Sequence, residues 1–308
     1  MTAISLWVHV DMKSEMLMEM LGDWQHDTTT LADLFQDAEP FPHVVIDDFF
    51  SAEVADRIEK RFPVPFGTRS EWLQQGWHIY DNPIEGKLAC DNVERMGNHD
   101  HVFADMWKML QSDHLLELMS QITRIKDLEQ DPHLHGAGLH LHPPGGRLEM
   151  HLDYSIHPIS KKERRVNLIV YMNQDWKEEW GGHLALWEGT LNGLKEGKVA
   201  TIAPMFNRAV LFRTSDVSWH GMPDPVMCPE GNARKSVAIY FVSESRPDAT
   251  PRYKAAFRPR PGVMPPLEEM NYCRLCKIRE ERRLEEEDVK EHLPSFIPRW
   301  KEVHSGKH

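Results

Sequence analysis

The chain has 308 residues, of which 41% are hydrophobic and 27% are charged, and its formal net charge is −12. This composition is typical of a soluble globular protein, and the acidic balance argues against nucleic acid or a membrane surface as a partner. No apolar run approaches the roughly 20 residues that span a bilayer, and residues 1–11 lack the basic segment of a signal peptide. Four cysteines in a chain of this length do not indicate a disulfide scaffold, so we expect a reducing, cytoplasmic location.

The first 130 residues predict a mainly helical region that supports the core. Residues 41–50 read as a strand, and Ser51 can cap a helix whose apolar stripe is Val54, Ile58 and Phe62. Two further helices are expected over residues 101–113 and 114–125, where apolar side chains recur at four-residue spacing.

The pattern changes near residue 138 to short alternating apolar segments. Eight strands are expected to start near residues 138, 149, 166, 183, 199, 209, 217 and 235. Turn signals such as Pro143-Pro144-Gly145-Gly146 separate several of them. Eight antiparallel strands predict a jelly roll, so the fold class is mainly β with flanking helices and the core spans residues 131–245.

Residues 246–308 predict a linker and a charged helical extension. Prolines near residues 259–266 indicate extended chain, and the charge pattern over 277–287 indicates a helix that faces solvent. Cys273 and Cys276 have the spacing of half a zinc site, but no second pair is nearby, so ordinary thiols are expected.

A His-x-Asp motif and a distant histidine suggest a metal site. His151 and Asp153 alternate on one face of a predicted strand, and His220 follows 67 residues later. Two imidazoles and one carboxylate on one face of an octahedron are the ligand set of non-haem Fe(II) oxygenases. Alone the motif is weak, because the chain has 18 histidines and a core histidine beside a solvated aspartate is the simpler interpretation.

Three neighbouring features strengthen the metal interpretation. Tyr171 lies near the end of an apolar strand, and Trp180-Gly181-Gly182 follows it. Arg234 and Lys235 open the last apolar strand, where a cation can hold the remote carboxylate of a metal-chelating acid.

These five features occur in one order across residues 138–242, and there the chain resembles 2-oxoglutarate- and Fe(II)-dependent dioxygenases of the prolyl-4-hydroxylase-like branch. Cys228-Pro229-Glu230-Gly231 resembles a segment of bacterial-type members. The resemblance implies a double-stranded β-helix that uses Fe(II), 2-oxoglutarate and O2, with ascorbate as a supporting reductant.

The resemblance also implies roles for individual residues. The metal ligands are His151, Asp153 and His220, and no further catalytic residue is expected. Arg234 would bind the far carboxylate of 2-oxoglutarate, although Lys235 is the alternative because fourteen residues separate His220 from Arg234, more than is usual in the family. The remaining assignments are Tyr171, His142 and Asn167 for 2-oxoglutarate, and Arg147 and Tyr154 for the prime substrate.

The resulting hypothesis is a dioxygenase that oxidises an unactivated C–H bond. The acidic ligand Asp153 favours hydroxylation over halogenation, because related halogenases replace that ligand with a small residue. The acidic chain favours a small-molecule substrate, such as an amino acid or natural-product intermediate. The alternatives are a hydroxylase of prolyl or other side chains in a protein or peptide, a non-catalytic jelly-roll metal-binding module, and a zinc hydrolase with the same ligands. Oligomeric state is not predicted.

Overall fold

The computed structural model describes residues 17–82, 84–258, 260–261, 266–282, 285 and 287. The helices are η1 (Asp23–His26), α2 (Thr28–Asp37), α3 (Ala52–Lys60), α4 (Arg69–Gln74), α5 (Val93–His99), α6 (His101–Leu110), α7 (Asp113–Thr123), η2 (Glu178–Trp180) and α8 (Pro266–Glu281). The strands are β1 (His43–Ile46), β2 (His78–Asp81), β3 (Glu85–Cys90), β4 (Glu129–Gln130), β5 (Gly138–His142), β6 (Arg147–Leu152), β7 (Glu163–Tyr171), β8 (Leu184–Thr190), β9 (Gly193–Ile202), β10 (Ala209–Arg213), β11 (Trp219–Met222), β12 (Arg234–Ser243) and β13 (Ala256–Phe257).

Eight antiparallel strands form the predicted double-stranded β-helix. β10, β7, β12 and β5 are neighbours in one four-stranded set, and β6, β11, β8 and β9 are neighbours in the other. Successive strands of the chain are divided between the two sets, so the sheets face each other as in a jelly roll. These are the eight strands expected from the sequence, and each begins within six residues of its predicted start.

The region before residue 131 contributes strands as well as helices. β1 extends one set by pairing with β10, and β3 joins the two sets by pairing with both β5 and β6. β2 pairs with β3, and β4 pairs with β12. The predicted boundary at residue 130 therefore does not coincide with an edge of the sheet.

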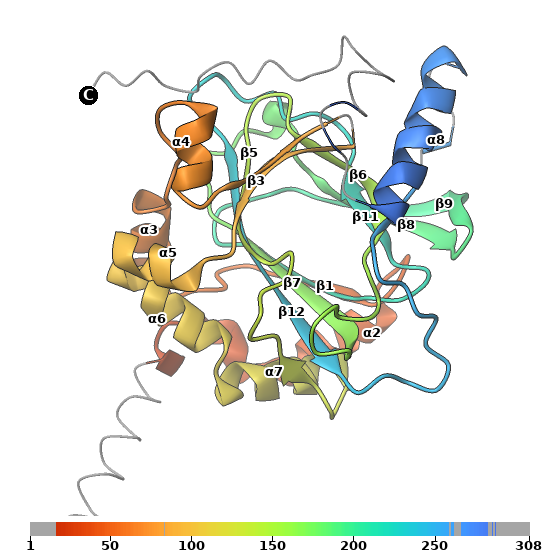
Figure 1. The fold of residues 1–308 in the computed structure, drawn as a ribbon. Coiled ribbons are helices and arrows are strands. Elements are labelled where there is room, and N and C mark those ends of the chain that lie inside the picture. The colour runs from red at the N-terminus through yellow and green to blue at the C-terminus, as the bar shows by residue number, and fades with distance from the viewer. Residues whose placement is uncertain are drawn as a thin grey trace, which may run out of the picture.

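The N-terminal helices pack on the outer face of one strand set, as Figure 1 shows for α3, α6 and α7. Ser112 and Asp100 cap α7 and α6 with their side chains. Apolar residues of these helices form one buried cluster with outward-facing strand residues such as Leu139, Val237 and Ile239. Alternation then turns the intervening, more polar residues of β5 and β12 toward the space between the two sheets.

The C-terminal helix differs from the prediction of a solvated charged helix over residues 277–287. In the described residues α8 begins at Pro266 and ends at Glu281, and residues 283, 284 and 286 lie outside them. Leu275 and Cys276 are buried against Ile84 and Phe257. Arg279 Nε lies 2.9 Å from Glu85 Oε2 on β3. The helix therefore docks on the core beside β6 and β11 (Figure 1), because Leu275, Cys276 and Arg279 all contact the core.

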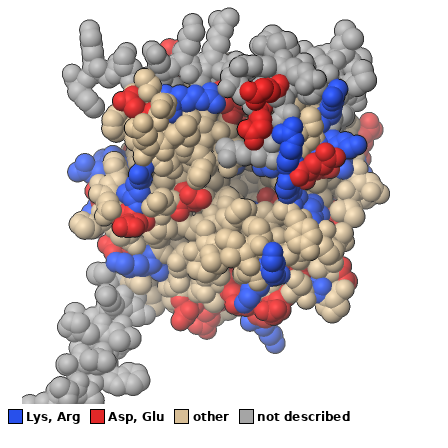
Figure 2. Space-filling model, in the orientation of Figure 1, with Lys and Arg blue, Asp and Glu red and all other residues tan. Residues whose placement is uncertain are grey.

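No helix in the described part of the chain has the length and apolar character needed to cross a bilayer. On the face drawn in Figure 2, acidic and basic side chains are interspersed.

Candidate active site

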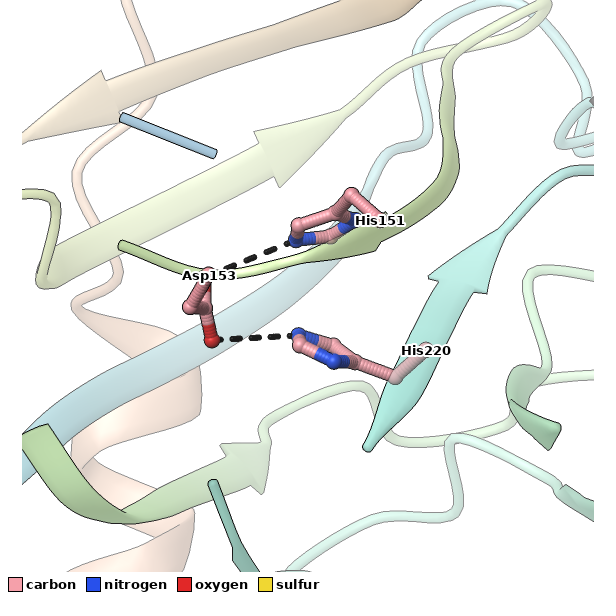
Figure 3. Close-up of side chains that lie close together, drawn as sticks. All are labelled: His151, Asp153 and His220. Atoms are coloured by element: carbon pink, nitrogen blue, oxygen red, sulfur yellow. Dashed lines mark ion pairs between the residues drawn. The ribbon is translucent and has the colours of Figure 1, made fainter. Parts of the chain in front are cut away.

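Three side chains with metal-binding chemistry converge at one end of the space between the sheets. His151 lies on β6, Asp153 follows that strand, and His220 lies on β11. His151 Nε2 is 3.6 Å from Asp153 Oδ1, and His220 Nε2 is 3.3 Å from Asp153 Oδ2. The possible ligand atoms of all three lie within 4.8 Å of one another, and Figure 3 shows the side chains turned toward a common point.

Strand pairing brings the two histidines together. His151 and His220 are directly opposite each other in the antiparallel β6–β11 pair, a position in which side chains are close neighbours. His151 Nδ1 lies 2.8 Å from the Glu149 carbonyl oxygen, and His220 Nδ1 lies 2.9 Å from the Ser218 carbonyl oxygen. When each Nδ1 donates its N–H to the carbonyl, the Nε2 atom keeps a free lone pair, which is the form in which histidine binds a metal.

Asp153 is held in place as an ionised carboxylate. Asn167 Nδ2 donates a hydrogen bond to Asp153 Oδ2 at 2.8 Å, and Arg164 Nη2 lies 3.0 Å from the same oxygen. Burial alone would raise the pKa of Asp153, but the charges of Arg164 and His220 hold this pKa well below its ordinary value. The amide of Asn167, predicted from the sequence to contact 2-oxoglutarate, is therefore engaged beside the metal ligands.

Sequence reasoning missed Arg164 because a β-bulge changes the alternation of β7. Val166 pairs with Phe241 on β12, but Arg164 pairs with the adjacent Val242, so β7 has one extra residue. Strict alternation would place Arg164 and Asn167 on opposite faces. With the bulge they share one face, and Arg164 Nε donates to Asn167 Oδ1 at 2.8 Å.

A cavity of about 720 Å³ opens beside the three ligands. Its walls come from both strand sets and from β3, and Arg279 of α8 contributes to them. The sequence did not predict β3, so its cavity residues Glu85, Lys87 and Ala89 were missed. The alternation of Glu85 and Lys87 was the available signal, but two polar side chains in a six-residue segment that contains a glycine are a weak one.

Arg234, not Lys235, faces this cavity. Arg234 is buried, its Nε donates to the Gly182 carbonyl oxygen at 2.7 Å, and its guanidinium lies 4.6 Å from the centre of the Tyr171 ring. Lys235 points outward to Glu59 of α3, with Nζ 2.9 Å from Oε1. Among the described residues no carboxylate lies within ion-pair distance of Arg234, so its terminal nitrogens are available to an anionic ligand.

Gly182 shows why the segment Trp180-Gly181-Gly182 requires a glycine at its last position. Its φ of +73° is in the left-handed region, and a Cβ atom there would lie 2.9 Å from Arg234 Cδ. A side chain at this position would displace the buried arginine.

His142 fits the same ligand. It lies directly opposite Arg234 in the β5–β12 pair and lines the cavity. Burial, then Arg234 and Lys87, lower the pKa of His142 well below its ordinary value, so the ring is neutral at pH 7. Both ring nitrogens are buried without a hydrogen-bond partner among the described residues. Buried polar atoms are normally satisfied, so this pair indicates a polar ligand that binds beside Arg234.

The two residues predicted to contact the prime substrate differ in position. Tyr154 lines the cavity, its hydroxyl donates to the His135 carbonyl oxygen at 3.0 Å, and Arg164 lies over its ring at 4.8 Å. Arg147 lies on β6, 3.7 Å from Glu149, and is not among the residues that line the cavity.

The fold and the site together define a class of protein. A double-stranded β-helix carries two histidines and an ionised aspartate at the mouth of a cavity, and a buried, unpaired arginine lines the same cavity. This donor set leaves half of an octahedral Fe(II) open, and the arginine offers a site for a dicarboxylate that chelates the metal.

Comparison with known families agrees with that class. Residues 137–242 match the model of the 2OG-Fe(II) oxygenase superfamily, where 2OG is 2-oxoglutarate. This region belongs to that superfamily, and the chain is a dioxygenase that uses Fe(II), 2-oxoglutarate and O2. No curated protein matches the chain significantly.

Several similar solved structures are prolyl hydroxylases. One from Trichoplax adhaerens, in complex with a hypoxia inducible factor peptide, is 16% identical, with a TM-score of 0.48 over 73% of this chain and 95% of that one. A Pseudomonas putida prolyl-4-hydroxylase is 17% identical, with a TM-score of 0.45 over 70% and 100%. A Phytophthora capsici prolyl 4-hydroxylase is 21% identical, with a TM-score of 0.47 over 88% and 81%.

Asn167→Ala is expected to weaken Fe(II) binding by about 10- to 100-fold, because groups that orient a ligand contribute about that much to metal affinity. The substitution removes the hydrogen bond that fixes Asp153 Oδ2. Metal affinity is measured by titrating the apoprotein with Fe(II) under anaerobic conditions. Asn173→Ala is the matched control, because it removes a buried side-chain amide just after β7 that donates to the Ala233 carbonyl oxygen. An unchanged Fe(II) affinity in Asn167→Ala would mean that Asp153 is positioned without it.

Proposed function

We propose that this dioxygenase hydroxylates an unactivated C–H bond of a small molecule, such as an amino acid or a natural-product intermediate. The observation that carries the proposal is the cavity of about 720 Å³ that is lined by both the histidine–aspartate cluster and Arg234. Its volume is within the range of about 300–1,000 Å³ that is usual for small-molecule sites. Docked α8 supplies part of the wall, which favours a compact substrate over an extended chain.

In this proposal His151, Asp153 and His220 bind Fe(II). Bound iron with 2-oxoglutarate supplies the oxidising power by coupling O2 reduction to loss of CO2 and formation of succinate. The ligand Asp153 supports hydroxylation, because a carboxylate fills the position that a halide would need. The chain's other task is to orient the reactants and exclude bulk water from them.

Arg234 is proposed to bind the far carboxylate of 2-oxoglutarate through its terminal nitrogens. The Arg234 guanidinium lies over the Tyr171 ring, 4.6 Å from its centre. Neutral His142, opposite Arg234, can donate a hydrogen bond to the same carboxylate. Tyr154 is proposed to contact the prime substrate from the cavity wall, and Arg147 to act at its rim. Asn167 is proposed to orient Asp153 instead of contacting 2-oxoglutarate.

The catalytic unit is proposed to extend beyond residues 131–245. β1 and β3 belong to the sheet on the N-terminal side, and β13 with α8 closes the cavity on the C-terminal side. We also propose a cytoplasmic location, supported by free thiols at Cys90 and Cys228.

The test is succinate formation by the full chain with Fe(II), 2-oxoglutarate and ascorbate. One arm adds free amino acids and small metabolites, and a second adds proline-containing peptides. The expected result is stimulation by a member of the first arm, with one equivalent of a product that has gained one oxygen atom. Stimulation by peptides alone would replace the proposal with the protein-hydroxylase alternative. Absence of succinate in every arm would favour the non-catalytic module.

A further inference from the structure

Lys87 is a cavity cation that the reaction described above does not use. It lies on β3, lines the cavity, and has its Nζ 5.1 Å from the centre of the Tyr80 ring. Among the described residues no carboxylate lies within ion-pair distance of this amine. Glu85 and Ala89, the alternate residues of the same strand, line the cavity with it.

Apart from Arg234, the other charged residues of the cavity wall already have partners. Five cations and three carboxylates line the cavity, although the chain as a whole carries a net charge of −12. Arg164 pairs with Asp153 at 3.0 Å, and Arg279 pairs with Glu85 at 2.9 Å. The remaining pairs are Asp91 with His78 at 3.2 Å, and Lys254 with the carbonyl oxygen of Glu281 at the end of α8.

Cofactor binding would not neutralise Lys87. Fe(II) brings two positive charges and 2-oxoglutarate two negative charges, so together they leave the cavity's charge unchanged. The far carboxylate of 2-oxoglutarate has Arg234 as its partner in the proposed function. Burial lowers the pKa of Lys87, and the charge of Glu85, which pairs with Arg279 at 2.9 Å, offsets only part of that effect. An anion supplied by the substrate would stabilise the charged amine further.

The strand register separates two sites for carboxylates. Leu88 pairs with Leu141 in β3–β5, so Lys87 is opposite His142, and His142 is opposite Arg234 in β5–β12. The three residues therefore form one row across three neighbouring strands. Neutral His142 lies between the two cations. A carboxylate bound to Lys87 and one bound to Arg234 would therefore lie beside different strands.

We propose that the prime substrate is a small carboxylic acid whose carboxylate pairs with Lys87. This inference rests on the proposed function and names its substrate class. Lys87 would be the residue that selects a free acid over the corresponding amide or amine, and it would position the carbon chain between its own strand and the metal ligands. Lysine is suited to this role as a compact point charge on a flexible stem.

The experiment uses the full chain loaded with Mn(II) and N-oxalylglycine, an inert analogue of 2-oxoglutarate. Binding of small molecules is measured by isothermal titration with matched sets: a carboxylic acid, its primary amide and the corresponding amine. In the wild type, acids are expected to bind at least about 10-fold more tightly than their amides. Lys87→Met should remove that preference, and Lys87→Glu should shift it to amines.

Three controls make the result decisive. Lys254→Met replaces a second cavity lysine whose amine is engaged by Glu281, so it should keep the preference for acids. Substrate-independent succinate formation by the wild type tests the proposed function by itself, which separates failure of this inference from failure of the proposed function. A peptide with an internal glutamate and blocked ends should bind no better than an amide.

The inference is overturned if the wild type does not prefer acids, or if the preference persists in Lys87→Met. It is equally overturned if Lys254→Met loses the preference to the same degree, since the effect would then reflect total charge. A raised 2-oxoglutarate requirement in Lys87→Met would assign the lysine to the co-substrate. Tight binding of the blocked peptide alone would place the carboxylate on a polypeptide and refute the small-acid class.

Discussion

Replacing any one of His151, Asp153 and His220 with alanine is expected to lower succinate formation by more than about 100-fold. Groups that merely orient a metal ligand contribute about 10- to 100-fold, so loss of a ligand itself should cost more. The possible ligand atoms of the three residues lie within 4.8 Å of one another and are the proposed protein ligands of the metal. Succinate formed per minute, at saturating 2-oxoglutarate, is the measurement.

The fold should survive these substitutions. The strands that carry the ligands are held by pairing and by apolar clusters, such as the one containing Met150, Leu152 and Trp219. Circular dichroism and the thermal midpoint of each variant should therefore remain near the wild type. His183→Ala, which removes a histidine paired with Glu178, is the matched control and should retain activity. Full turnover by a purified, iron-loaded variant would remove that residue from the ligand set.

The sequence predicted those features of the fold that depend on local pattern. Period-two alternation identified the eight core strands, and in β5 and β12 alternate residues face the helices and the cavity. His151 and Asp153 could be assigned to one face for the same reason. His220 was predicted as the third ligand from its position in the order of the motifs. The choice of Arg234 over Lys235 followed from alternation as well, since adjacent strand residues point to opposite sides.

What the sequence did not predict depends on long-range pairing. β3 is six residues long and contains a glycine, and its role comes from pairing with β5 and β6, which lie more than 45 residues away. Glu85 and Lys87 were missed with it. Arg164 was missed because the bulge in β7 is visible only when the strand is aligned with β12.

The charge pattern of the C-terminal helix identified its exposed part but not its start. None of the described residues 277–282 is buried, as a solvated helix predicts, but the helix begins at Pro266. Burial depends on Leu275 and Cys276, two adjacent residues too few to produce a clear apolar stripe. The pairing of Arg279 with Glu85 could be inferred only once β3 was known to line the cavity.

Arg234→Ala is expected to raise the 2-oxoglutarate concentration needed for half-maximal succinate formation by about 30-fold or more, with little change in the Fe(II) requirement. Truncating one partner of a buried, hydrogen-bonded charge pair costs roughly 2–5 kcal/mol, and each 1.4 kcal/mol is about tenfold in affinity. The guanidinium is buried beside Tyr171 and His142, where the missing charge cannot be replaced by solvent.

Lys235→Ala is the matched control, because it removes a neighbouring cation of the same strand. Its amine pairs with Glu59 on the outside of the sheet, so the 2-oxoglutarate requirement should stay within about twofold of the wild type, the scale of an outer ion pair. Arg234→Lys should recover only part of the loss, since lysine retains the charge but cannot form two parallel hydrogen bonds with one carboxylate. If Lys235→Ala raised the requirement and Arg234→Ala did not, the co-substrate would bind on the opposite face of β12, and the cavity assignment would be wrong.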